Sequence, residues 1–219
     1  MNITANLQQI KSTIPAKVTL VAVSKTYPNT AILQAYEVGQ RVFGENKVQE
    51  LVEKYESLPK DIEWHMIGHL QSNKVKYIAP FVKLIHGVDS LKLLQEINKR
   101  AEQNHRKIDC LLQVHIAQEE TKFGFDENEV IELLKSDEIK TLKNINVIGL
   151  MGMATNTENE TLVRNEFKNL KQLFDKLAAF NLQLSTLSMG MSNDYKIAIE
   201  EGSTMIRVGS SIFGSRDYH

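Results

Sequence analysis

Residues 18–25 read VTLVAVSK, an almost unbroken apolar run that ends in a hydroxyl and a primary amine. A strand with one face in water alternates apolar and polar side chains, whereas a parallel strand covered on both faces is apolar throughout. The run therefore predicts a buried parallel strand with helices packed over it.

The same pattern recurs along the chain. Short β-branched runs alternate with longer segments whose apolar residues are spaced three and four apart, which indicates repeated βα units. Eight βα units that close on themselves form a single (β/α)8 TIM barrel, and 219 residues suit a compact barrel that makes residues 1–219 one domain. An open doubly wound sheet is the alternative. We predict strands at 18–24, 41–43, 62–67, 84–88, 108–116, 145–151, 184–188 and 205–208.

The chain before the first strand also carries a pattern. Leu7, Ile10 and Ile14 predict an amphipathic helix there. Only residues 209–219 follow the last predicted strand, too few for a full final helix. We therefore expect the amino-terminal helix to take that vacant place on the barrel.

Composition excludes several functional classes. With 26 Lys and Arg against 27 Asp and Glu, the net charge is -1, so no basic surface for nucleic acid is expected. No apolar run is long enough to span a membrane and no leader precedes the first helix, so we expect a cytoplasmic protein. Cys110, the only cysteine, lies in an apolar run and is predicted to be a buried strand residue.

Lys25 is the first candidate for chemistry. Active sites of such barrels lie at the carboxyl ends of the strands, and Lys25 directly continues the first strand. A dry floor beneath its ammonium would favour the neutral amine, which attacks carbonyl groups to form a Schiff base. A lysine that extends from a strand end into water is the alternative.

Two glycine and serine loops follow the last two strands. The loops are 188–192, which begins with Ser188, and 209–211, which contains Gly209 and Ser210. Backbone amides and hydroxyls at this end of a barrel commonly bind phosphate. Glycine turns with serine caps are the alternative. Together with Lys25, the loops predict a phosphorylated carbonyl ligand.

Arg207 and the histidines complete the candidates. The guanidinium of Arg207 lies inside the last strand and needs an acceptor, which is either a ligand atom or a carboxylate in an ion pair. His65 and His69 are separated by a change from strand to loop, so we predict no metal site. His86 and His115 are predicted to be hydrogen-bonded barrel residues.

Five motifs in order along the chain carry a family resemblance. They are 21–28 VAVSKTYP, 43–50 FGENKVQE, 64–74 WHMIGHLQSNK, 187–192 LSMGMS and 202–214 GSTMIRVGSSIFG. With these motifs the chain resembles the YggS/PROSC family of pyridoxal 5'-phosphate homeostasis proteins along essentially its whole length. It departs from the family at Tyr27 and Lys47, where many members carry lysine and tyrosine.

The resemblance implies a barrel like the N-terminal domain of alanine racemase, with pyridoxal 5'-phosphate (PLP) held as a Schiff base on Lys25. It implies a function in binding, buffering or delivering PLP, with PLP-dependent apo-enzymes as candidate recipients and no established catalysis. By motif position, Arg207 would face the pyridine nitrogen, Ser188, Gly209 and Ser210 would hold the phosphate, and Asn46 would lie near the ring.

Catalysis remains the alternative function. An arginine at the pyridine nitrogen leaves that nitrogen unprotonated, which makes the ring a weak electron sink. Alanine racemases also add a second domain with an opposing tyrosine, and we expect none here. Weak racemisation would need Tyr27 or Tyr195 as the second acid or base. A phosphosugar aldolase with a Schiff-base lysine is a third hypothesis. We expect a monomer.

Overall fold

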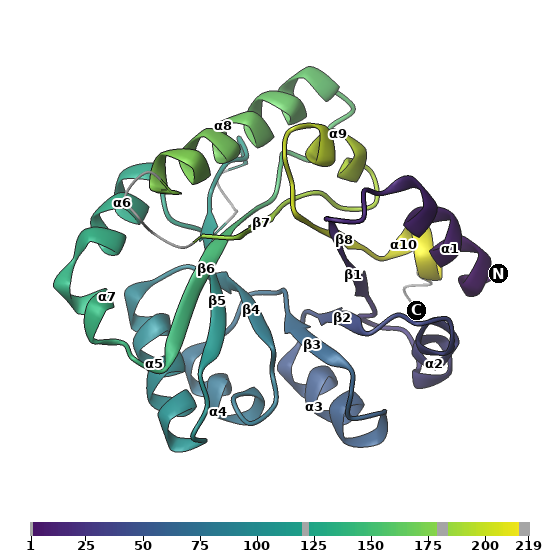
Figure 1. Cartoon of the computed structure of the whole chain (residues 1–219), viewed down its shortest axis with the longest axis horizontal. Coiled ribbons are helices and arrows are strands. Elements are labelled where there is room, and N and C mark those ends of the chain that lie inside the picture. The colour runs from purple at the N-terminus through teal and green to yellow at the C-terminus, as the bar shows by residue number, and fades with distance from the viewer. Residues whose placement is uncertain (1, 120–122, 179–183, 215–219) are drawn as a thin grey trace.

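Eight parallel strands alternate with helices and close into one barrel in the order β1 to β8 (Figure 1). The computed structural model describes residues 2–119, 123–178 and 184–214. Direct pairing of β1 with β8 closes the barrel, so the TIM barrel is confirmed and the open sheet is wrong. The strands are β1 Thr19–Val23, β2 Val42–Glu45, β3 Glu63–Met66, β4 Leu84–Val88, β5 Ile108–Val114, β6 Ile145–Gly152, β7 Thr186–Ser188 and β8 Met205–Val208.

Helices surround the barrel, and their apolar faces pack on the outer side of the strands (Figure 1). None of the helices in the described ranges is long and apolar enough to cross a membrane. The helices are α1 Ile3–Thr13, α2 Asn29–Glu37, α3 Val48–Ser57, α4 Val75–Ile78, α5 Leu91–Gln103, α6 Glu127–Lys135, α7 Asp137–Thr141, α8 Glu160–Ala178, α9 Tyr195–Glu200 and α10 Ser210–Phe213, with a 3-10 turn at Ser72–Lys74.

The first helix occupies the predicted place. Figure 1 shows α1, in purple, beside the short α10, in yellow, and the side-chain amide of Asn6 donates to the carbonyl of Ile212 across 3.0 Å. Helix α1 buries Ile3, Leu7 and Ile10, and Asn2 caps its start. Burial of this apolar stripe compensates for the short helix after β8.

The barrel has two apolar regions, because successive side chains of a strand point to opposite faces. A large region lies between strands and helices and includes Cys110, which is fully buried as predicted. A smaller cluster, Val21, Leu84, Leu111, Met151 and Met205, fills the interior. This cluster forms an apolar floor inside the barrel.

Close approach of β6 and β7 depends on Gly149. A Cβ atom at this position would lie 1.7 Å from the carbonyl oxygen of Thr186, which only glycine avoids. The contact keeps Met151 of β6 in register with Ser188 of β7. Met151 of the apolar floor therefore lies beside Ser188 at the end of β7.

Candidate functional site

The carboxyl-terminal end of the barrel, called the mouth below, collects the predicted site residues. Strand β1 lies between β2 and β8, with Val23 opposite Gly44 and Ala22 opposite Val208. The loops that begin at Ser24, Asn46 and Gly209 therefore follow three adjacent strands. This adjacency comes from barrel closure, since the first and last strands are far apart in sequence.

Lys25 lies in a tight turn at the mouth. The backbone N–H of Tyr27 donates to the carbonyl of Ser24 across 3.1 Å, so Lys25 and Thr26 are the two central residues. Lys25 is half-buried. Thr26 has φ +70°, a left-handed conformation that is unfavourable for a β-branched side chain. Such strain persists only where the surrounding structure imposes it, and it is often found at functional sites.

Arg207 lies inside the barrel and is only 4% exposed. Its guanidinium donates to the Ser188 carbonyl at 2.9 Å, the Ser188 hydroxyl at 2.6 Å and the Gly152 carbonyl at 3.0 Å. Burial lowers the pKa of Arg207 to about 10, and Asp194 opposes this shift. Within the described ranges no carboxylate forms an ion pair with Arg207, so the predicted ion-pair alternative lacks support there.

A buried chain of hydrogen bonds continues from Arg207. Nδ1 of His86 lies 3.1 Å from the Ser188 hydroxyl, and Nε2 of His86 lies 3.0 Å from Nδ1 of His65. Because arginine only donates, we assign the Ser188 hydroxyl as its acceptor and as donor to His86, whose Nε2–H then donates to His65. The predicted hydrogen bonding of His86 is confirmed, and the Ser188 hydroxyl is already engaged on both sides.

Burial keeps both imidazoles of this chain neutral. It lowers the pKa of His65 to about 3, with a smaller contribution from Lys83. It also holds the pKa of His86 well below its ordinary value, helped by repulsion from His65 and Arg207. In the hydrogen-bond chain from Arg207 through Ser188 and His86 to His65, the positive charge at neutral pH therefore lies on Arg207.

The two predicted phosphate loops lie side by side. The backbone N–H of Gly209 donates to the hydroxyl of Ser192 across 3.2 Å, and Ser210 is exposed beside it. Sequence reasoning identified the loop 188–192 but selected its first serine, Ser188, which is fully buried. Ser192 is the serine at the mouth, and its place four residues beyond the strand end is the signal that indicates it.

Asn46 borders the mouth from the β2 side and is half-buried. A Cβ atom on Gly68 would lie 2.5 Å from the carbonyl oxygen of Asn46, so the loops after β2 and β3 touch through their backbones. Gly68 is needed for this close approach. The contact fixes Asn46 on the rim.

The remaining histidines form local contacts. His69 lies 3.2 Å from the carboxylate of Asp89 and stacks on Phe123 with ring centroids 4.8 Å apart. Nε2 of His115 lies 2.9 Å from the carbonyl of Glu119. Among the residues that the structure describes, no group of three or more histidine, cysteine or acidic side chains is placed to hold a metal.

Phe123, whose ring stacks on His69, is an exposed aromatic residue that the sequence did not predict as a contact of His69.

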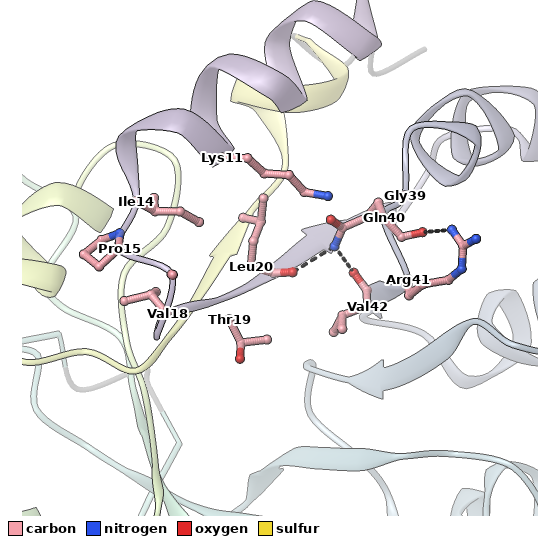
Figure 2. Close-up of a pocket in the computed structure, with 11 residues that line it drawn as sticks. Lys11, Ile14, Pro15, Val18, Thr19, Leu20, Gly39, Gln40, Arg41 and Val42 are labelled. Carbon is pink, nitrogen blue, oxygen red and sulfur yellow. Dashed lines mark hydrogen bonds between the residues drawn. The ribbon is translucent and has the colours of Figure 1, made fainter.

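A surface pocket of about 330 Å³ lies at the opposite, amino-terminal end of the barrel, called the base below (Figure 2). Its central feature is Gln40, whose amide nitrogen donates to the carbonyls of Leu20 at 2.8 Å and Val42 at 2.7 Å. Arg41 beside it pairs with Asp61 at 2.9 Å. Since this end of a barrel mainly serves stability, the mouth is the stronger candidate site.

Comparison with known proteins gives consistent matches. The family model described as "Alanine racemase, N-terminal domain" matches residues 1–217. A pyridoxal phosphate homeostasis protein from Aquifex aeolicus is 45% identical over 91% of this chain and 87% of that protein.

Solved structures extend the comparison. PipY from Synechococcus elongatus, in a structure with PLP bound, superposes with a TM-score of 0.87 at 36% identity over 97% of this chain and 100% of PipY. Alanine racemase from Clostridium difficile superposes with a TM-score of 0.84 at 16% identity over 98% of this chain and 60% of the racemase, and shares the fold.

Proposed function

Because the chain belongs to the alanine racemase N-terminal domain family, and within it to the pyridoxal phosphate homeostasis proteins, we propose that it binds PLP at the mouth and serves PLP homeostasis. The observation that carries this proposal is the half-buried Lys25 in a strained turn, on a barrel whose interior holds a buried arginine that donates to neutral oxygens of Ser188 and Gly152. Buffering of PLP and its delivery to PLP-dependent apo-enzymes are part of the proposal.

The donor set of the mouth fits this cofactor. PLP carries a phosphate, a pyridine nitrogen that accepts hydrogen bonds, and an aldehyde. The mouth offers the Gly209 loop with the hydroxyls of Ser192 and Ser210 for the phosphate, and the Arg207 guanidinium as a pure donor. Lys25 supplies the primary amine. Asn46 and Ser188 complete the proposed set, with Ser188 acting through Arg207.

Each residue has a distinct part in holding the ligand. When bound, PLP supplies an aldehyde that condenses with a primary amine and releases water. Lys25, two residues beyond the end of β1, contributes that amine. The loop amides and hydroxyls bind the anion, and the Ser188–His86–His65 chain orients Arg207.

We propose binding without substantial turnover. An arginine cannot protonate a pyridine nitrogen as a carboxylic acid can, so carbanion chemistry on the ring is weakly supported. Racemisation also requires a second acid or base opposite the lysine. Tyr27, one of the two predicted candidates, donates its hydroxyl to the carbonyl of Gly214 across 2.5 Å and packs on Phe213. This contact already engages the hydroxyl proton of Tyr27.

The decisive experiment replaces Lys25. Wild-type protein incubated with PLP should develop a visible absorption band, and borohydride should fix PLP on the peptide that contains Lys25, as mass spectrometry would show. Lys25→Ala should lose the fixed adduct, whereas Lys17→Ala, an exposed lysine before β1, should retain it. A reducible adduct that persists at the mouth of Lys25→Ala would contradict the proposal.

Turnover is measured on the same preparation. Deuterium incorporation at Cα of alanine or serine should be undetectable in heavy water. Exchange that requires Lys25 would instead favour the racemase alternative.

We expect the protein to be a monomer, which light scattering would show as a single species of monomer mass.

A further inference from the structure

Three charged side chains form a buried cluster just outside the barrel, behind the Lys25 turn. The ammonium of Lys54 donates to Glu45 at 2.8 Å and to Glu50 at 2.6 Å. Glu45, at the end of β2, is fully buried, and the Lys54 and Glu50 side chains of α3 are 6% and 22% exposed. Glu45, Glu50 and Lys54 are called the brace below.

The brace holds the residue on each side of Lys25. The Ser24 hydroxyl donates to Glu45 at 2.6 Å, and the Ser24 carbonyl accepts from Lys54 at 2.7 Å. The backbone N–H of Thr26 donates to Glu50 at 2.5 Å. The lysine turn is therefore attached to α3 by hydrogen bonds to charged groups, which are stronger than neutral ones.

These contacts account for the strain in the turn. Thr26 has φ +70°, and a threonine leaves this conformation unless other contacts impose it. The Glu50 carboxylate accepts the Thr26 N–H in the observed conformation and would lose that bond if the backbone turned away. Stability alone explains the brace poorly, because replacing a buried ion pair by apolar side chains of similar volume often leaves the free energy of unfolding unchanged or raises it.

We propose that the brace is a positioning device, in which Glu50, Lys54 and Glu45 hold the Ser24–Thr26 backbone so that the Lys25 amine is presented at the mouth. The proposal deepens the proposed function and rests on it. The brace residues act through Lys25 from the outer side of the barrel, and are positioning residues rather than catalytic ones.

The test compares three variants on one helix. Glu50→Ala removes the acceptor of the Thr26 N–H, whereas Glu50→Gln keeps an acceptor oxygen without the charge. Glu53→Ala removes an exposed carboxylate whose partner is Gln49, and serves as the matched control. Measured quantities are the rate of formation of the borohydride-reducible adduct with PLP and the equilibrium affinity for PLP.

We expect the adduct to form roughly tenfold or more slowly in Glu50→Ala, because the turn then relaxes from its bound geometry. Glu50→Gln should keep most of the rate, and Glu53→Ala should match wild type. Equal rates in Glu50→Ala and wild type would overturn the proposal, and so would equal losses in the alanine and glutamine variants.

Two measurements on the protein without PLP separate this proposal from the proposed function. Amide hydrogen exchange in the peptide that contains Thr26, and the reactivity of Lys25 toward an acylating reagent, should both change in Glu50→Ala. If wild type formed no adduct on Lys25, the proposed function would fail. Amide exchange and Lys25 acylation would still show whether the brace holds the Lys25 turn. Should Glu50→Ala not fold, Glu50→Asp retains the charge with a shorter reach and is expected to show the same losses.

Discussion

At the base of the barrel, Gln40 donates to two carbonyls of neighbouring strands and Arg41 pairs with Asp61, whereas at the mouth the buried Arg207 donates to neutral oxygens of Ser188 and Gly152. Just behind the mouth, the brace holds a carboxylate oxygen, Oε2 of Glu45, that is buried without a hydrogen-bond partner among the described residues. Gln40 and Arg41 at the base thus find local acceptors, while the buried charge of Glu45 behind the mouth is only partly compensated.

This difference shows where the fold buries a charge at an unfavourable free energy. Burying a charge without full compensation is unfavourable, so its persistence needs a reason other than stability. A ligand that accepts hydrogen bonds from Arg207 and a turn that must be held rigid both supply such a reason. The comparison predicts that substitutions at the mouth change pH dependence and ligand affinity, and that substitutions at the base change stability alone.

The largest expected effect concerns Glu45. Burial raises the pKa of its carboxyl from the ordinary 4.5 to about 7, although Lys54 and Ser24 oppose the shift. The unfolded chain therefore releases this proton at lower pH than the folded protein does, so the free energy of unfolding falls as pH rises through this interval. The expected fall is about 3 kcal/mol for a shift of this size.

The measurement is urea unfolding of wild type and Glu45→Gln from about pH 4 to about pH 8. Glutamine cannot lose a proton, so the difference in free energy of unfolding between wild type and Glu45→Gln should change with pH by this amount. The difference between wild type and the control Glu53→Gln should stay constant with pH. Parallel curves for wild type and Glu45→Gln would mean that Glu45 does not titrate in this interval and that its charge is compensated like those at the base.

Arg207 gives the second effect. Arg207→Met removes the proposed donor to the pyridine nitrogen, and PLP affinity should fall about tenfold to a hundredfold, as expected for the loss of a charged hydrogen bond. Spectroscopic titration with PLP measures the affinity. Arg164→Met, which removes an exposed partner of Glu200 and Glu201, is the control and should bind as wild type does. Unchanged affinity in Arg207→Met would assign the arginine a purely structural role.

Gln40 gives the smallest effect. Gln40→Leu removes one hydrogen-bond donor from each of the carbonyls of Leu20 and Val42, which should lower the free energy of unfolding by about 1 to 2 kcal/mol. Affinity for PLP should stay at the wild-type value. Thermal and urea unfolding check the first part and titration the second. A loss of affinity in Gln40→Leu would mean that the two ends of the barrel are coupled.

Much of the fold was predictable because the strands are local apolar runs. The ends of β4 and β8 agree with the predicted residues. Strand β5 ends at Val114, two residues before the prediction, because the His115 N–H donates to the returning Phe125 carbonyl at 2.9 Å instead of continuing the strand. The apolar residue Ile116 lies beyond the end of the strand, so apolar character alone placed that end too late.

The site was predictable only in part. Lys25 and Gly209 follow strand ends, and the predicted family resemblance is confirmed by the match over residues 1–217. The assignment of Ser188 to the phosphate stays a prediction, although its hydroxyl contacts Arg207 and His86 in the structure. The contact of Ser192 with Gly209 joins residues from two different loops, and no local pattern indicates it.

By itself, the sequence determined the number and order of the βα units, the buried character of the strands and the end of the barrel at which chemistry is expected, because each depends on residues close together in the chain. Only the tertiary structure decided that Lys54 reaches Ser24, 30 residues away, and that Arg207 begins a chain through His86 to His65. Such contacts depend on barrel closure and on the inward or outward direction of each side chain, and these are set when all eight strands pack together.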